Sequence, residues 1–265
     1  MRGVGLHVVF GTCWLAGCGS EVGLRSAAEP VDFRNPIDIV DSGVPIDQGM
    51  PTATAAIYAH TLDELFTFDP ETLTPTFVGP FRQGDELVVN MTDIAIDFDG
   101  ELWGISSTEL FRINPDTAEV ESQCGVLGLP VGLTFTSKGS LYVGDDQVYE
   151  LDPESCAKRP VTGFDFFLTS GDLVPLPDLK LYWTVWNLTG GTGDLIVRVD
   201  VDGEAEVIGD TNEPAVWGLG YADDLLYGFA ATGRVVAIDP QTGDSELVLT
   251  TPYEWAGATT NPVVW

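Results

Sequence analysis

Short apolar stretches alternate with turn residues from about residue 56 to the end of the chain. In GELWGISSTELFRINPDTAEV (100–120), turn residues separate three such stretches, a pattern typical of β-strands joined by tight turns. Five segments superimpose without a gap, and each contains an apolar strand, a turn at a fixed place and a strand that ends in an aromatic residue. They are DIAIDFDGELW (93–103), GLTFTSKGSLY (132–142), DLVPLPDLKLY (172–182), WGLGYADDLLY (217–227) and WAGATTNPVVW (255–265). The chain therefore contains a repeat of about 40 residues.

A second turn motif follows most copies of the repeat. An Asx residue precedes proline, so that its side chain can cap its own backbone while proline fixes the next φ. The copies are Asp69-Pro70-Glu71-Thr72, Asn114-Pro115-Asp116-Thr117, Asp152-Pro153-Glu154-Ser155, Asp239-Pro240-Gln241-Thr242 and a degenerate Asp200-Val201-Asp202-Gly203. We interpret these carboxylates as turn formers; a row of ligand-binding acids is the alternative.

A repeat of this length with four short strands predicts an all-β fold, a β-propeller. Strands such as Leu110–Ile113 are apolar on both faces, as expected for blades packed between neighbours. The first copy begins at its second strand, and the chain ends soon after an inner-strand pattern. We therefore predict five blades of four antiparallel strands, with 255–260 closing the ring beside Tyr58. Val263-Val264-Trp265 would then duplicate a second strand, so six blades is the alternative.

The first 17 residues form a predicted lipoprotein signal peptide. Arg2 precedes a short apolar segment, and Leu15-Ala16-Gly17-Cys18 resembles the bacterial lipobox. This resemblance implies lipidation of Cys18, although a chance cysteine in an ordinary signal peptide would look similar. Residues 18–52 lack a sustained apolar period and predict an acidic, flexible tether, which leaves 53–265 for the propeller domain.

The chain is strongly acidic, with 11 Lys and Arg against 41 Asp and Glu and a formal charge of −30. Such a surface repels nucleic acid, so we expect no nucleic-acid partner. The expected membrane contact is the lipid anchor, because no later segment is apolar enough to span a bilayer. We expect the protein in the bacterial cell envelope, facing the periplasm or the cell surface.

Only Cys124 and Cys156 lie in the predicted propeller domain, and an even pair outside the cytoplasm predicts a disulfide; two free thiols are the alternative. Beyond the leader the only histidine is His60, which excludes metal sites built from several histidines. The Asp-x-Asp-Gly elements at 97–100 and 200–203 lack the rest of a calcium loop and are interpreted as hairpin turns. We expect no metal and no cofactor.

In a propeller, the first residues of the inner strands surround one mouth of the central channel. The superimposed repeats place Asp93, Gly132, Asp172, Trp217 and Trp255 there. The two acids and two indoles predict a funnel that binds a sugar by stacking and hydrogen bonding, or a cation. The alternative is structural: the tryptophans pack between blades and the aspartates cap strand ends.

The lipobox and the repeats over 56–265 together resemble bacterial envelope lipoproteins with a β-propeller of the broad NHL, YVTN or quinoprotein-like kind. This resemblance implies an architecture and no particular reaction. The sequence favours a non-enzymatic scaffold that binds a protein or carbohydrate. The alternative is a hydrolase or lyase that acts on a glycan through Asp93 and Asp172. Whether the protein is an enzyme therefore stays open, with a binding role preferred.

Overall fold

The computed structural model describes residues 50–264 except 89, 146, 162–166 and 201–203. The chain divides into a unit Met1–Asp47 and a unit Gln48–Trp265 that contains all described residues. The predicted signal peptide (1–17), Cys18 and most of the predicted tether lie outside the described residues. So does most of the degenerate turn at 200–203. The described residues form strands and turns, with no helix among them.

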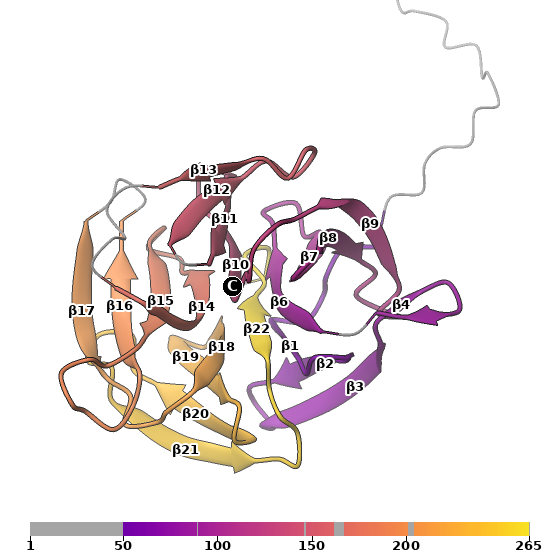
Figure 1. Cartoon of the computed structure of the whole chain (residues 1–265). Coiled ribbons are helices and arrows are strands. Elements are labelled where there is room, and N and C mark those ends of the chain that lie inside the picture. The colour runs from indigo at the N-terminus through magenta and orange to yellow at the C-terminus, as the bar shows by residue number, and fades with distance from the viewer. Residues whose placement is uncertain (1–49, 89, 146, 162–166, 201–203, 265) are drawn as a thin grey trace, which may run out of the picture. The chain divides into compact units, whose positions relative to one another are not determined.

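Five antiparallel sheets of four strands surround a central axis (Figure 1), which confirms the predicted propeller. Blade 1 contains β22 (Gly257–Thr260), β1 (Ile57–His60), β2 (Glu64–Asp69) and β3 (Thr74–Pro80). Blade 2 contains β6 (Met91–Ile96), β7 (Leu102–Ser106), β8 (Glu109–Ile113) and β9 (Val120–Gly125). Blade 3 contains β10 (Gly132–Phe135), β11 (Leu141–Gly144), β12 (Val148–Leu151) and β13 (Lys158–Pro160).

Blade 4 contains β14 (Thr169–Pro175), β15 (Leu181–Val185), β16 (Leu195–Val199) and β17 (Ala205–Asp210). Blade 5 contains β18 (Val216–Ala222), β19 (Leu225–Ala230), β20 (Arg234–Ile238) and β21 (Ser245–Thr250). A small hairpin of β4 (Arg82–Gln83) and β5 (Glu86–Leu87) connects blades 1 and 2. The inner strands of blades 1 to 5, closest to the axis in Figure 1, are β22, β6, β10, β14 and β18.

The ring closes as predicted, because the C-terminal strand β22 supplies the inner strand of blade 1. Tyr58 of β1 pairs with Thr259 of β22. The alternative of six blades is wrong: residues 261–264 form no strand, and the amide Nδ2 of Asn261 donates instead to the carbonyls of Ala53 and Ala55 (3.0 and 3.1 Å). Closure removes two open sheet edges, which are sites of unwanted strand pairing.

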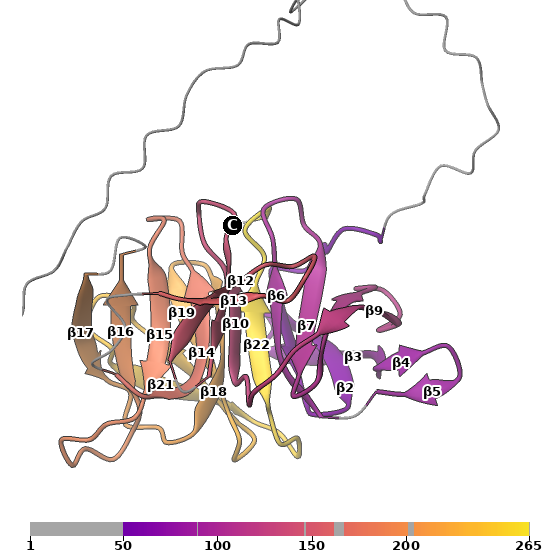
Figure 2. The same cartoon turned by 45° about the horizontal axis from the view of Figure 1, so that its top comes forward.

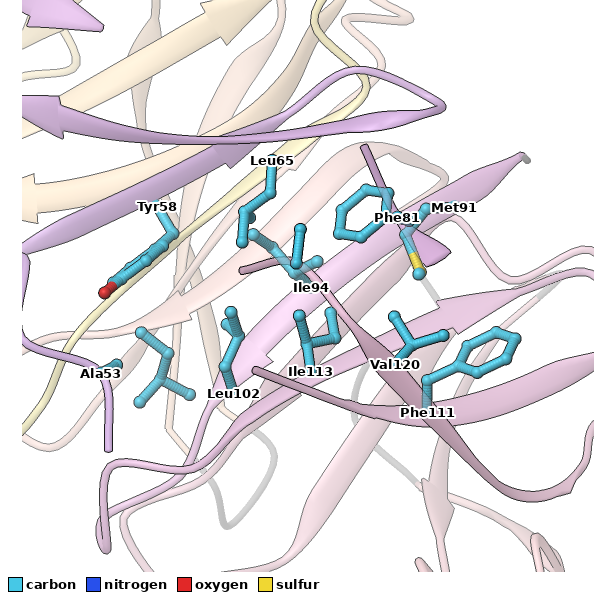
Figure 3. Packing of buried hydrophobic residues seen from close by; sticks show 12 residues of the cluster. Ala53, Tyr58, Leu65, Phe81, Met91, Ile94, Leu102, Phe111, Ile113 and Val120 are labelled. Carbon is cyan, nitrogen blue, oxygen red and sulfur yellow. The ribbon is translucent and has the colours of Figure 1, made fainter. Parts of the chain in front are cut away.

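Five hydrophobic clusters fill the molecule, one at each junction between neighbouring blades. At the junction of blades 1 and 2, Tyr58 and Leu65 pack with Ile94, Leu102 and Phe111 (Figure 3). Each blade is thus covered on both faces. This arrangement explains why the strands are apolar at successive positions instead of alternating with polar residues.

The Asx-Pro elements form the predicted turns. In all four proline-containing copies the Asx side chain accepts a hydrogen bond from the backbone N–H two residues later, at 2.7–2.9 Å. The residue four positions after the Asx has a positive φ in each: Leu73, Ala118, Cys156 and Gly243. The hydrogen bonds to Asp69 and Asp152 lower the pKa of both carboxyl groups, as expected for turn-capping carboxylates.

The predicted disulfide is present between Cys124 and Cys156. Cys124 lies in β9, the outer strand of blade 2, and Cys156 lies in the turn after β12 of blade 3. The bond therefore connects two neighbouring blades on the outside of the ring. It supplements a junction that is otherwise held mainly by apolar contacts.

The propeller has two faces, and we name the face where the inner strands begin the entry face. It carries the loops that lead from one blade to the next and the loops between second and third strands. In Figure 2 these loops lie at the lower edge, opposite the C-terminus.

Candidate functional site

The strand registers define which inner-strand residues are equivalent. In each blade an aromatic residue of the second strand pairs with an inner-strand residue, as Trp103 pairs with Ala95 and Tyr227 with Gly220. In every blade, the residue two positions before that inner-strand partner lies at the same height along the central axis. These equivalent residues are Asp93, Gly132, Asp172, Gly218 and Gly257. The axis is therefore surrounded by two carboxyl groups and three glycines.

Trp217 and Trp255 are not equivalent to the two aspartates, which corrects the gapless superposition. In blade 5 the pair Ala222–Leu225 encloses only Asp223 and Asp224, one residue fewer than the loop between Asp97 and Glu101 in blade 2. Trp217 therefore precedes the axial position and occupies the register shift between Val216 and Gly218. A bulge of this kind redirects a side chain, and Trp217 is half-buried.

Trp255 lies two residues before the axial position and is fully buried. Its ring packs against Phe66, Phe229 and Tyr253, with centroids 5.1–5.5 Å away. It thereby joins the inner faces of blades 5 and 1. The observed contacts of Trp255 therefore match the alternative considered from the sequence, in which the tryptophans pack between blades.

Asp93 and Asp172 connect neighbouring blades through backbone hydrogen bonds. Oδ1 of Asp93 accepts from the N–H of Ile94 (2.8 Å), and Oδ2 accepts from Leu133 in blade 3 (2.5 Å). Oδ1 of Asp172 accepts from Leu173 (2.6 Å), and Oδ2 accepts from Leu219 in blade 5 (2.8 Å). Both side chains are completely buried. All four carboxyl oxygens are thus engaged by strand backbone.

The two carboxyl groups also interact with each other across the axis. Burial raises the pKa of Asp172 well above its ordinary value, and the nearby Asp93 carboxyl raises it further. Burial also raises the pKa of Asp93, against the opposing effect of His60. Two buried carboxylates in contact cannot both ionise without a large cost. We therefore expect the pair to hold a proton to a higher pH than an exposed aspartate does.

His60, on the second strand of blade 1, is the third polar group at the axis. Its Nδ1 donates to the carbonyl of Thr61 (2.7 Å), which only accepts, so Nδ1 carries the hydrogen. Its Nε2 lies 3.8 Å from Oδ1 of Asp93, and both side chains have no exposed surface. Nε2 has no hydrogen-bond partner among the described residues. Nothing in the sequence indicated that His60 neighbours Asp93.

A pocket of about 310 Å³ opens on the entry face where the ring closes, between blades 5 and 1. Its walls include Trp217, the loop Thr61–Asp63 after β1, and the loop Pro252–Ala256 before β22. Trp217 and Trp255 therefore share one pocket, whereas the buried pair Asp93 and Asp172 does not line it. The sequence predicted that the two tryptophans share a site, but it contained no signal for the loop residues around them, because those loops do not repeat.

The entry face also exposes several large apolar side chains. Leu127 and Leu129, in the loop between blades 2 and 3, are 89% and 73% exposed. Trp186 and Leu188 follow β15 and are 50% and 73% exposed. The N–H of Trp186 donates to the carbonyl of Leu168 (3.0 Å), another exposed apolar residue, which connects two loops of this face.

The acidic motifs do not assemble into a metal centre within the described ranges. No group of three or more His, Cys, Asp or Glu there could hold a metal ion. Asp97 of the first Asp-x-Asp-Gly element accepts hydrogen bonds from the N–H groups of Asp99 and Glu101 (3.0 and 2.9 Å). It therefore forms a turn, as predicted. In this part of the chain no helix is long and apolar enough to cross a membrane.

Comparisons with known proteins find distant similarities to solved structures. No protein-family model matches the chain, and no curated protein matches it. Among solved structures, a gluconolactonase-like protein is 14% identical, with a TM-score of 0.49 over 79% of this chain and 88% of its own. Virginiamycin B lyase from Staphylococcus aureus is 14% identical, with a TM-score of 0.39 over 72% of this chain and 64% of its own.

BamB from Moraxella catarrhalis is 16% identical, with a TM-score of 0.38 over 80% of this chain and 64% of its own. Sequence identities this low and TM-scores below 0.5 transfer neither an activity nor a partner. The assignment of the fold depends on the sheet order of this chain itself.

Proposed function

We propose that this protein is a non-enzymatic binding scaffold of the bacterial cell envelope, anchored through a lipid on Cys18, with its entry face as the binding surface. The observation that supports the binding role is a difference in accessibility between the axis and this face. At the axis both carboxyl groups are buried, and each of their oxygens already accepts a backbone N–H. On the entry face an open pocket and exposed apolar side chains are available to a partner.

The buried axis argues against the alternative, a glycan hydrolase or lyase that uses Asp93 and Asp172. A glycosidase needs one carboxyl group that donates a proton and a second that attacks or activates water, and both must reach the sugar. In this chain neither side chain has exposed surface, and each oxygen already accepts a backbone N–H. Replacement of Asp93 with Asn should therefore leave any glycan turnover unaffected. A folded variant that loses turnover would support the enzyme and contradict the scaffold.

Site-specific photocrosslinking in intact cells tests the binding surface. A photoreactive amino acid at Trp186 on the entry face should crosslink to a discrete partner. The same amino acid at Phe98, in the β6–β7 hairpin of the opposite face, serves as the matched control. The Leu129→Ser substitution should reduce the crosslink at position 186 if the apolar side chains contribute to the contact. Equal crosslinking from both faces would contradict the proposal.

Anchoring is tested separately by the Cys18→Ser substitution. The wild-type protein should carry a mass increase from lipid and sediment with membranes, whereas the variant should do neither. A variant that still sediments with membranes after a high-salt wash would contradict the anchor and leave the binding role untouched.

A further inference from the structure

The pocket where the ring closes combines aromatic walls with acidic side chains. Trp217 and Tyr253 are half-buried and line it, so part of each ring remains accessible. Leu62 and Pro252 add exposed apolar surface. The charged side chains of its lining are the carboxylates of Asp63 and Glu254, both exposed.

This combination favours a ligand that is positively charged and also has apolar surface. An aromatic face attracts a cation, most strongly when the cation is weakly hydrated. No Lys, Arg or His is present among the described residues that line the pocket, so nothing there would pair with an anion. The protein's formal charge of −30 further raises the local concentration of cations. A primary ammonium would lose strong hydration in this pocket, whereas a quaternary ammonium presents methyl groups to the rings.

A buried donor adds a second requirement. Trp255 lines the same pocket, and its Nε1–H is buried with no acceptor among the described residues. A buried N–H without a partner costs about 1–3 kcal/mol. Because Trp255 is fully buried, its ring would have to turn toward the pocket, where a hydroxyl or carbonyl oxygen beside the ligand's cation would supply the missing acceptor.

We propose that this pocket binds a small quaternary ammonium compound that carries an oxygen acceptor. The inference rests on the proposed binding role and specifies one ligand of the entry face. Trp217 and Tyr253 would contact the methylated nitrogen, and Asp63 and Glu254 would balance its charge. The volume of about 310 Å³ is at the small end for ligand pockets.

Calorimetric titration of the full-length protein with choline tests the proposal. Choline should bind, and its uncharged isostere 3,3-dimethylbutanol should bind about tenfold more weakly, a difference of about 1.4 kcal/mol that the cation–π contact would supply. Tetramethylammonium, which lacks the hydroxyl group, should fall between them. Binding of choline should also weaken at high salt. Equal binding of choline and its isostere, or no binding of choline, would overturn the proposal.

Matched variants locate the site. Glu254→Gln should weaken choline binding several-fold, whereas Glu246→Gln on the exposed face of β21 should not. Trp217→Leu should abolish detectable binding, and Phe98→Leu, in the β6–β7 hairpin of the opposite face, should leave it unchanged. If Trp217→Leu fails to fold, the comparison of Glu254→Gln with Glu246→Gln still shows whether choline binds in this pocket. Absence of choline binding by the wild-type protein, together with an intact crosslink at position 186, would overturn this inference alone.

Discussion

Oδ2 of Asp93 accepts a hydrogen bond from the N–H of Leu133, 40 residues further along the chain and in the next blade. Asp172 and Leu219 repeat the arrangement between blades 4 and 5. Each buried aspartate thus holds together two sheets that are otherwise connected by apolar side chains. The bond direction also fixes the height of one inner strand relative to the next.

Replacement of Asp93 with Ala should destabilise the propeller by about 1–3 kcal/mol, because the N–H groups of Ile94 and Leu133 would lose their acceptor inside the protein. Relief of repulsion with Asp172 offsets part of the loss. Asp116→Ala, at an exposed position, should change the free energy of unfolding by less than about 0.5 kcal/mol. Urea denaturation measures both, and equal values would contradict the role of Asp93 as a connection between blades.

The stability of the protein should depend on pH through Asp172. Its pKa is raised in the folded state, mainly by burial, from an ordinary value of 3.8. As the pH rises above 3.8, the unfolded chain releases this proton first, so the free energy of unfolding falls until the folded carboxyl group ionises. The wild type should therefore lose stability relative to Asp172→Asn as the pH rises above 3.8, until the folded carboxyl group has ionised.

Asp152→Asn provides the control with the opposite sign. The pKa of Asp152 is lowered by the backbone N–H groups of Glu154 and Ser155. Its contribution is present above pH 3.8 and disappears as the pH falls through the folded pKa. Thermal melts across the pH range should give opposite slopes for the two comparisons. If the difference in stability between the wild type and Asp172→Asn does not change with pH, the folded state does not hold the proton of Asp172 more tightly.

Loss of the disulfide should destabilise the junction of blades 2 and 3. Cys124 and Cys156 are 32 residues apart, and a loop of that length predicts about 3–4 kcal/mol of stabilisation from restriction of the unfolded chain. The double substitution to alanine should lower the free energy of unfolding by that amount. Alkylation before reduction should leave both cysteines of the wild type unlabelled. Labelling under denaturing, non-reducing conditions would contradict the bond.

The repeat, the turns and the closure of the ring could be predicted because they depend on local pattern. Apolar strands recur about every 40 residues, and the Asx-Pro turns need only adjacent residues. The axial set was predicted for Asp93 and Asp172 but misassigned for Trp217 and Trp255. The cause is loop length: the blade 5 hairpin is one residue shorter, and β22 has no hairpin after it. A gapless superposition of sequences cannot detect either difference.

The neighbours of the axial carboxyl groups could not be predicted for a different reason. His60 reaches Asp93 from another blade, and only the ring geometry brings them within 3.8 Å. The pocket likewise combines Asp63 and Glu254 from loops nearly the whole domain apart in sequence. Such contacts depend on closure, which the sequence indicated, and on side-chain positions, which it did not.

Closure also makes Gly257 a sensitive position. A Cβ atom on this residue of β22 would lie 2.4 Å from Oδ1 of Asp93 and 2.4 Å from Nε2 of His60. Neither group can move freely, because each is fixed by a hydrogen bond on its other polar atom. Gly257→Ala should therefore destabilise the protein by about 1–3 kcal/mol through overpacking.

Gly125→Ala is the matched control, since the nearest atom to a Cβ there is 3.8 Å away and its φ is not positive. This substitution in β9 should be neutral or slightly stabilising, because alanine reduces the freedom of the unfolded chain. Guanidinium denaturation of both variants measures the difference. A stable Gly257→Ala protein would mean that β22 does not lie against the axial carboxyl group. Because β22 supplies the inner strand of blade 1, that result would also contradict the closed ring.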